Sequence, residues 1–341
     1  VVAGTGGLGC AARSRPVARQ PPPEPGPPVS EPAPTPTPPP VPPAPVPRAP
    51  QPAGIVLRVE TGPHGSGVVE AVDIDTYVRD VVVGELSVSS RDGALATSAY
   101  EAQAIVARTY ALSVRGRHAA DGFDVCSTTH CQVYARDQWR RSRWAAEIDA
   151  AVRRTSGRYL AVESGRPIEA VFHAHCGGHT SAAAEVWRGV GAAYLQGVDD
   201  PYCVREQPAP WSVTLDLEDV RTALNRQPRT AVGDRLDGVQ VLRRDAGGRV
   251  VEVAVSGSRA PVMTGEDFRR AVMAAQGPRS IRSTRFEVTR TGHQLRFVGQ
   301  GSGHGVGLCQ IGLLGRLRAG QSVEAALLAY YPGARLVSPG T

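Results

Sequence analysis

One carboxylate stands out in the stretch YVRDVVVGELSVSS, residues 77–90, because Glu85 follows three valines and a glycine. Burial beside apolar groups disfavours the charged form of a carboxyl group and raises its pKa. A carboxylic acid with a raised pKa can protonate a glycosidic oxygen near neutral pH. Glu85 is therefore a candidate general acid, and the alternative is a surface glutamate at the end of a helix.

The number of carboxylates decides which glycan chemistry is open to Glu85. An ordinary glycosidase needs a second carboxylate across the cleft as nucleophile or base. The nearby acids have the spacing of a strand end, a helix cap and a solvated helix face; they are Asp73, Asp75, Asp80 and Asp92. A lytic transglycosylase needs only one acid, which first protonates the leaving oxygen. The same group then acts as base and helps the sugar's own 6-hydroxyl to close an anhydro ring.

A second constellation lies in HAADGFDVCSTTHCQVY, residues 118–134. Cys126 and Cys131 are separated by four residues, and His118 and His130 lie close to them in sequence. Two cysteines and two histidines complete a tetrahedral zinc shell, and a closed shell of this kind is structural because a catalytic zinc keeps an open position. The alternative is a disulfide between Cys126 and Cys131 in an oxidising envelope.

Two further segments are rich in histidine or glycine. The segment VFHAHCGGHT (171–180) holds His173, His175 and His179, which suits a second metal site or the wall of a cleft. Its Cys176 could pair with Cys203, although sequence alone does not establish connectivity. In GQGSGHGVGLCQIG (299–312), glycines flank His304 and would expose it to a substrate, whereas the alternative is a tight structural turn.

Helical and strand patterns alternate along the chain and predict an α+β fold. Short alternating strands are expected within 54–60 and 66–75, followed by a helix that Asp75 caps and Glu85 ends or follows. Small residues at helical spacing within 92–117 predict a central helix that packs closely, and 137–155 predicts a second helix.

The domain organisation follows from changes of composition. Residues 54–335 are expected to form one domain, with an inserted α+β subdomain at about 208–290 and a tail at 336–341. Before it, eighteen prolines between Pro21 and Pro52 predict a disordered tether over 21–53. Residues 1–20 read as the remnant of a signal or anchor, with Cys10 in a poor lipoprotein-type box, or as a trimmed start.

Charge and hydropathy exclude two function classes. The net charge is +6, but the arginines are scattered rather than gathered in a stripe with aromatics, so nucleic acid is not expected as a partner. No run of 18 apolar residues is present, so no transmembrane span is expected. The Pro-rich tether suits an exported protein of the periplasm or cell envelope, with Cys10 as the candidate point of lipid attachment.

Six motifs in order resemble the stage II sporulation protein D / LytB family. They are YVRDVVVGEL, EAQAIVARTYAL, HCQVY, FHAHCGGHT, YLQGVDDPYC and GSGHGVGLCQIG, and they lie within residues 55–335. The resemblance implies a peptidoglycan lytic transglycosylase. Such an enzyme cuts linkages from N-acetylmuramic acid to N-acetylglucosamine in peptide-stripped glycan strands and leaves 1,6-anhydro ends.

The resemblance also assigns roles to residues. It makes Glu85 the catalytic acid and places Gln103, Arg108 and Tyr110 on the helix that lines the cleft. Gln132, His173 and His304 complete the residues expected to bind substrate. His118, Cys126, His130 and Cys131 match the zinc ligands of some members, which favours structural zinc over a disulfide; no cofactor is expected for the chemistry.

The chain departs from the family pattern in a few positions. Glu101 replaces a common Lys, and Leu86-Ser87 replaces Met-Pro after Glu85. In the Gly-rich loop, Ser302 stands where a bulky aromatic is common, and Cys309 stands where a Ser is common. These changes predict a reshaped cleft around a retained acid.

Two other functions compete with this hypothesis. The first is a non-catalytic glycan-binding activator of a cell-wall amidase, a partner that the LytB name suggests. The second is a zinc amidase that uses the histidines from His173 to His179. Only the transglycosylase depends on the carboxyl group of Glu85 for glycan cleavage.

Overall fold

The computed structural model describes residues 54–62, 65, 67–206 and 209–339. The predicted signal remnant, the Pro-rich tether and Cys10 lie outside the described residues. Helices and strands are mixed along the described chain, so the predicted α+β fold class is confirmed.

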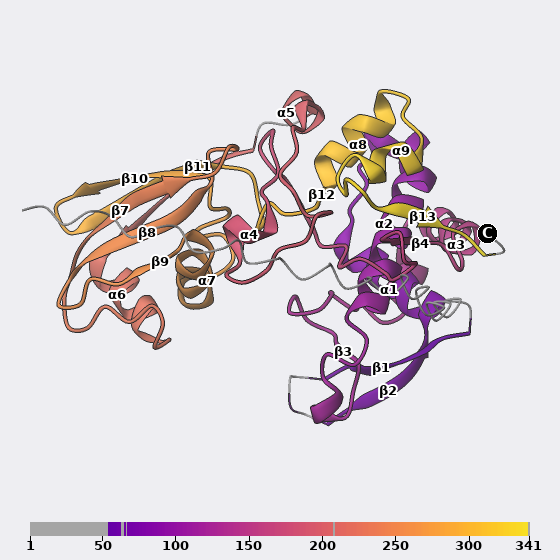
Figure 1. Ribbon diagram of the computed structural model, residues 1–341, viewed down its shortest axis with the longest axis horizontal. Helices are drawn as coiled ribbons and strands as arrows, with labels where there is room; N and C mark the ends of the chain where they lie inside the picture. Colours follow the sequence, from indigo (N-terminus) through magenta and orange to yellow (C-terminus); the bar gives the residue numbers. More distant parts are fainter. Residues whose placement is uncertain (1–53, 63–64, 66, 207–208, 340–341) are drawn as a thin grey trace, which may run out of the picture. The chain divides into compact units, whose positions relative to one another are not determined.

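The first part of the chain alternates short strands with helices (Figure 1). In order, its elements are β1 (Val56–Glu60), β2 (Val69–Asp73), α1 (Ile74–Glu85), the 3-10 helix η1 (Ser90–Leu95), α2 (Ala96–Ser113), η2 (Ala119–Asp121), β3 (Val125–Cys126), η3 (Gln138–Arg141), α3 (Ala145–Arg154), β4 (Tyr159–Ala161), β5 (Phe172–His173), α4 (Ala183–Val186) and α5 (Pro201–Glu206).

The second part carries longer strands and then returns to helices. Its elements are β6 (Pro210–Asp216), α6 (Leu217–Asn225), β7 (Leu236–Arg244), β8 (Val250–Gly257), β9 (Val262–Thr264), α7 (Gly265–Gln276), β10 (Phe286–Thr291), β11 (Gln294–Gln300), β12 (Leu308–Cys309), α8 (Gln310–Arg318), α9 (Val323–Leu328) and β13 (Arg335–Val337).

Helix α2 forms the centre of the first hydrophobic cluster. Most of its residues are buried, including Ala99, Ala102 and Val106 of the predicted small-residue stripe. It contacts α1, α3, α8, α9 and β4 (Figure 1). Small side chains let these neighbours approach closely. The apolar surface that α2 buries against them stabilises the folded state.

Helix α1 carries Glu85 as its last residue. Asp73 caps it, with its side chain accepting from the backbone N–H groups of Asp75 and Thr76, so the predicted cap at Asp75 is wrong by two residues. Buried residues recur at helical spacing from Ile74 to Val82 and hold one face against the core. At Leu86 the backbone turns extended and ends the helix directly after Glu85.

A second hydrophobic cluster lies between Trp211 and Phe297. It packs α6 and α7 with two three-stranded sheets, ordered β10-β11-β6 and β7-β8-β9. The first cluster includes Cys203 before this segment and Val306 after it. We therefore propose that the segment of the second cluster is a subdomain inserted into the first.

The predicted helix over 137–155 is split in two. Ser142 has extended backbone between η3 and α3, and its Oγ accepts from the backbone N–H of Trp144 at 3.1 Å. The indole Nε1 of Trp144 and the guanidinium of Arg143 both donate to the carbonyl of Val88. Contacts with a distant segment therefore override the local helical pattern.

A buried ion pair joins α1 to α2. The side chain of Arg108 is 0% exposed, and its Nε and Nη2 donate to Asp75 Oδ1 at 3.1 and 2.7 Å. Its Nη1 donates to the carbonyl of Arg158 at 3.3 Å, and Ser156 donates to the second oxygen of Asp75. Arg108 thus crosslinks elements inside the core and presents no charge to solvent.

We expect Arg108→Met to destabilise the protein by about 3–5 kcal/mol, because it leaves the carboxylate of Asp75 without its buried partner. Denaturant unfolding monitored by circular dichroism measures this change. Arg136→Met is the matched control, since it removes an exposed pair with Glu70 and should cost about 0–1 kcal/mol. Equal losses in the two variants would contradict a structural role for the buried pair.

Candidate functional site

Glu85 lies at the end of α1, half-buried, with its carboxylate directed at a neighbouring loop. Its Oε1 accepts a hydrogen bond from the backbone N–H of Val133 at 2.6 Å. Burial raises the pKa of Glu85, and the Val133 N–H opposes that rise by stabilising the charged form. The group is therefore an acid that holds its proton more tightly than an exposed glutamate does.

The glycine before Glu85 permits this contact. A Cβ atom at Gly84 would stand 2.7 Å from the carbonyl oxygen of Val133, closer than real Cβ atoms approach. The absence of a side chain lets the loop lie against the helix end. The Val-Val-Val-Gly-Glu pattern thus combines an apolar helix face, a point of close approach and an acid.

Glu85 also contacts the start of α8. The side-chain amide of Gln310 donates to the backbone carbonyl of Glu85 at 3.0 Å and to Oε1 of Gln103 at 3.3 Å. Gln103 comes from α2, so one amide links three helices around the acid. Gln310 and Val133 were not among the predicted site residues, although both lie in the motifs HCQVY and GSGHGVGLCQIG.

Gln132 and Tyr110, both predicted to bind substrate, interact with Tyr77 near Glu85. The hydroxyl of buried Tyr77 donates to Oε1 of Gln132 at 3.2 Å. Burial is the main cause of the raised pKa of Tyr77, and its electrostatic interactions with Cys131, Tyr110 and Glu85 act in the same direction. Tyr77 therefore lies among the acid, the cysteine cluster and Tyr110, and the structure brings these parts into one neighbourhood.

Asp80 anchors the loop that presents Val133. It is only 2% exposed, which corrects the expectation of a solvated helix face. Its Oδ1 accepts from the backbone N–H of Asp137 at 2.7 Å, and its own carbonyl accepts from Ala135 at 3.2 Å. Burial raises the pKa of Asp80 to about 6, partly offset by the Asp137 hydrogen bond.

The predicted metal ligands converge. The ligand atoms of His118, Cys126, His130 and Cys131 all lie within 4.8 Å of one another. Cys131 Sγ is 3.4 Å from His118 Nε2, and His130 Nδ1 is 3.7 Å from each sulfur. Tetrahedral zinc separates such atoms by roughly 3.3–3.8 Å, so the residues fit this ion. Oδ2 of Asp121 lies 3.6 Å from Nδ1 of His118. A carboxylate in this position orients the imidazole ring of a metal-binding histidine.

Other predicted site residues have partners of their own. Arg108 is held in the buried ion pair with Asp75, which gives its guanidinium a structural use. The hydroxyl of Tyr110 accepts from Arg117 Nη1 at 2.8 Å, and burial raises its pKa to about 12. Tyr110 is nearly buried, so the arginine covers the end of its ring.

His173 and His304 form a separate pair. Their ring centroids are 5.5 Å apart, and Trp187 packs on His304 at 5.0 Å. His304 is half-buried, accepts from the Val306 N–H and contacts the Phe172 carbonyl at 2.9 Å, which favours the tight-turn alternative over open exposure. Burial lowers its pKa to about 4, so the ring is neutral at physiological pH.

The histidines of 173–179 do not form a metal site in the described part of the chain. The groups found there with converging metal ligands include none of His173, His175 and His179. His175 instead lies against Cys203, and His179 faces Asp199 at 3.7 Å. This placement gives no support to a zinc amidase built from these residues.

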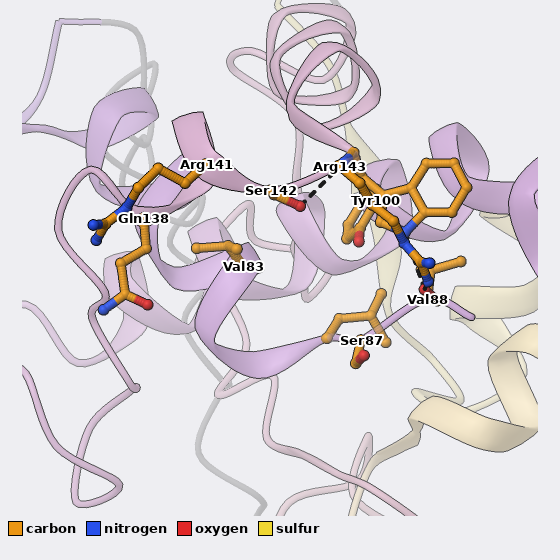
Figure 2. Close-up of a pocket in the computed structure, with 10 residues that line it drawn as sticks. Val83, Ser87, Val88, Tyr100, Gln138, Arg141, Ser142 and Arg143 are labelled. Atoms are coloured by element: carbon orange, nitrogen blue, oxygen red, sulfur yellow. Dashed lines mark hydrogen bonds between the residues drawn. The ribbon is translucent and has the colours of Figure 1, made fainter. Parts of the chain in front are cut away.

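A pocket of about 450 Å³ adjoins the segment that follows Glu85. Figure 2 shows Gln138 and Arg141 on one side of the pocket and Arg143 with Val88 on the other, with Val83 and Ser87 between them. Glu85 is not among the lining residues, because positions 83 and 85 point to opposite sides of a helix. The pocket is a basic hollow beside the acid rather than the site of the acid itself.

Comparison with known proteins identifies the family. A family model described as stage II sporulation protein (SpoIID) matches residues 63–161, and a domain of unknown function (DUF8618) matches residues 204–307. An uncharacterized protein of Brachyspira hyodysenteriae is 33% identical over 272 residues, which cover 79% of this chain and 68% of that protein. The chain belongs to the SpoIID/LytB family.

Other relatives carry names. Stage II sporulation protein D of Bacillus amyloliquefaciens is 28% identical over 78% of this chain and 74% of its own length. The amidase enhancer of Bacillus subtilis is 26% identical over 70% of this chain but only 38% of its own length. This SpoIID/LytB member therefore has a cell-wall-related function. Within the described residues, no helix is long and apolar enough to cross a membrane.

We expect Asp80→Asn to stabilise the protein at neutral pH. A carboxyl group whose folded pKa is raised from 3.8 to about 6 costs stability as pH rises through that window. Asparagine mimics the protonated form, so the variant should match the wild type below about pH 4 and exceed it by up to about 3 kcal/mol above pH 6. Unfolding curves across pH 3.5–7.5 measure the difference, and parallel profiles would contradict the raised pKa.

Proposed function

We propose that the protein is a peptidoglycan lytic transglycosylase with Glu85 as its general acid and base. The substrate is the linkage from N-acetylmuramic acid to N-acetylglucosamine in peptide-stripped glycan strands, and the products carry 1,6-anhydro ends. One observation carries this proposal: the half-buried carboxyl group of Glu85 has a raised pKa and accepts a hydrogen bond from one backbone N–H group. Because the proposed substrate is part of the cell wall, this activity would lie outside the cytoplasm.

The chemistry needs the two protonation states in turn. Protonated Glu85 gives its proton to the bridging oxygen as the bond from that oxygen to C1 of the muramic sugar breaks. The resulting carboxylate then takes the proton of the 6-hydroxyl while that oxygen bonds to C1. The Val133 N–H stabilises the intermediate carboxylate, because it donates to the charged form more strongly. No water and no second carboxylate take part.

Two buried amides support a role in glycan binding. Within the described residues, Nε2 of Gln103 and Nε2 of Gln132 have no hydrogen-bond partner. An unsatisfied buried donor costs about 1–3 kcal/mol, and such costs concentrate at functional sites. Both amides belong to the neighbourhood of Glu85, where a sugar hydroxyl or acetamido oxygen would satisfy them.

We also propose that His118, Cys126, His130 and Cys131 hold a structural zinc ion. The ion would supply no step of the reaction, because four protein ligands close its shell. Cys131 precedes Val133 by two residues, so the ion would fix the loop whose N–H meets Glu85. Zinc would thus affect Glu85 by fixing the position of the Val133 backbone N–H.

A second candidate is activation of a cell-wall amidase. The relative named amidase enhancer supports this function. Residues 204–307 match a second family model, so the chain has a segment, separate in sequence from the one that carries Glu85, that could bind a partner. An activator would bind glycan and amidase without needing the proton of Glu85.

We expect mass spectrometry of digests of peptide-stripped glycan strands to show 1,6-anhydro fragments with the wild type and none with Glu85→Gln. The wild-type rate should fall as pH rises through the raised pKa of Glu85, because only the protonated group is an acid. Glu163→Gln is the control, since Glu163 is exposed and distant in sequence from the site.

The outcomes separate the two candidates. Cleavage that persists in folded Glu85→Gln would exclude this mechanism. No cleavage by either protein, together with glycan binding and stimulation of an added amidase, would establish the activator function instead.

For the zinc proposal, we expect His118→Ala to lose one equivalent of zinc and to slow glycan cleavage by about 10- to 100-fold. That range corresponds to the loss of one hydrogen bond to a charged group, here from Val133 to Glu85. Plasma mass spectrometry of the purified protein measures the metal, and His293→Ala is the control. Unchanged zinc content in His118→Ala, or a disulfide between Cys126 and Cys131 in the wild type, would reject the site.

A further inference from the structure

A second group of metal-ligating side chains lies buried in the core. It consists of Cys176, Asp200, Cys203 and Cys309, whose ligand atoms all lie within 4.8 Å of one another. All four residues are buried, and they come from three segments of the chain: Cys176, the pair Asp200 and Cys203, and Cys309. Cys176 belongs to the CGG turn, Cys203 to α5, and Cys309 caps α8.

Backbone N–H groups point at the sulfur atoms of this group. The N–H of Cys176 donates to Cys309 Sγ at 3.2 Å, and the N–H of Gly312 donates to the same sulfur at 3.3 Å. The N–H of Gly178 donates to Cys176 Sγ at 3.3 Å. Donors aimed at buried sulfur stabilise thiolates, the form of cysteine that binds metal.

The fourth member is a carboxylate with 0% side-chain exposure. Asp200 Oδ2 lies 3.3 Å from Cys176 Sγ and accepts from the hydroxyl of Tyr330 at 2.8 Å. Its Oδ1 is buried without a hydrogen-bond partner in the described chain and has only the guanidinium of Arg316, at 3.8 Å. A buried carboxylate so weakly compensated is costly unless a further cation is present.

The backbone is shaped around this carboxylate. A Cβ atom at Gly312 would fall 1.9 Å from Asp200 Oδ2 and 2.3 Å from the Tyr330 hydroxyl. Only glycine therefore allows the first turn of α8 to reach the cluster.

We propose that Cys176, Asp200, Cys203 and Cys309 form a second structural zinc site. Three thiolates and one carboxylate close a tetrahedral shell, and soft sulfur donors favour zinc over magnesium or calcium. Tyr330 orients the carboxylate from behind, as outer-shell partners of metal ligands do.

A disulfide explains the same residues less well. The five described cysteines are unpaired in the structure. A bond between Cys176 and Cys203 would leave Cys309 as a lone buried sulfur with two N–H donors, beside an uncompensated Asp200. Metal binding uses all four residues.

This site would act on Glu85 through a contact other than the Val133 hydrogen bond. Cys309 is directly followed by Gln310, whose amide donates to the Glu85 carbonyl and to Gln103. A metal ion at Cys309 would fix the start of α8 and with it this amide.

The test is zinc stoichiometry of the full chain, expressed with zinc and dialysed against metal-free buffer. We expect two equivalents in the wild type, one in His118→Ala, one in Cys203→Ser and none in the double variant. X-ray absorption of His118→Ala should then show about three sulfur neighbours at roughly 2.3 Å, whereas the Cys2His2 site has two.

If Cys203→Ser does not fold, Tyr330→Phe provides a second test of the site. It keeps all four ligands but removes the hydroxyl that orients Asp200, and we expect zinc affinity at the second site to fall about 10- to 100-fold in a chelator competition. Circular dichroism confirms that each variant is folded.

Other results separate the two zinc proposals. One equivalent that survives His118→Ala and disappears in Cys203→Ser would support the second site and reject the first. One equivalent lost in His118→Ala alone, unchanged chelator competition in Tyr330→Phe, or a mapped disulfide between Cys176 and Cys203 would overturn the second site.

Discussion

The hydrogen bond from the Val133 N–H to Glu85 is the contact on which the site depends. Burial at the end of α1 raises the pKa of Glu85, and the single backbone donor limits that rise. With more donors the group would stay ionised and lose its value as an acid. With none, the carboxylate that the proposed reaction needs in its second step would be too costly to form. Gly84 permits the Val133 hydrogen bond, because any side chain at this position would push the Val133 loop away.

Both supports of Glu85 come from distant parts of the chain. The loop of Val133 is 48 residues away, and Gln310 is 225 residues away. Val133 lies in a loop without helix or strand, and Gln310 is the first residue of α8. Each also follows within two residues of a cysteine from a converging cluster, at Cys131 and Cys309. Metal crosslinks at these two positions would restrict the loop and the helix start without touching the substrate, so that local rigidity is obtained without a larger core.

The sequence predicts the acid and its helix because both are local. Apolar spacing from Ile74 to Val82 defines the buried face of α1, and Glu85 follows at its end. The burial of Asp80 could not be predicted, since it depends on a loop more than fifty residues later that folds back to meet it. The same holds for the helix predicted over 137–155, which Val88 divides by accepting two side-chain donors. Arg108 was predicted to contact substrate because the family resemblance implies that its helix lines a cleft, yet its side chain pairs with Asp75 inside the core.

Cys309 shows how a local role can be kept while a distant one is added. Its sulfur caps α8 by accepting from the Gly312 N–H, a task that the hydroxyl of a serine performs equally well. The family resemblance implies a serine at this position, and a serine would cap the helix as well, so the cap does not require cysteine. A thiolate is required only if the side chain also binds a soft metal. Because Cys176, Asp200 and Cys203 already converge on this point, exchange of oxygen for sulfur completes a four-ligand shell and leaves the backbone around Gln310 unchanged.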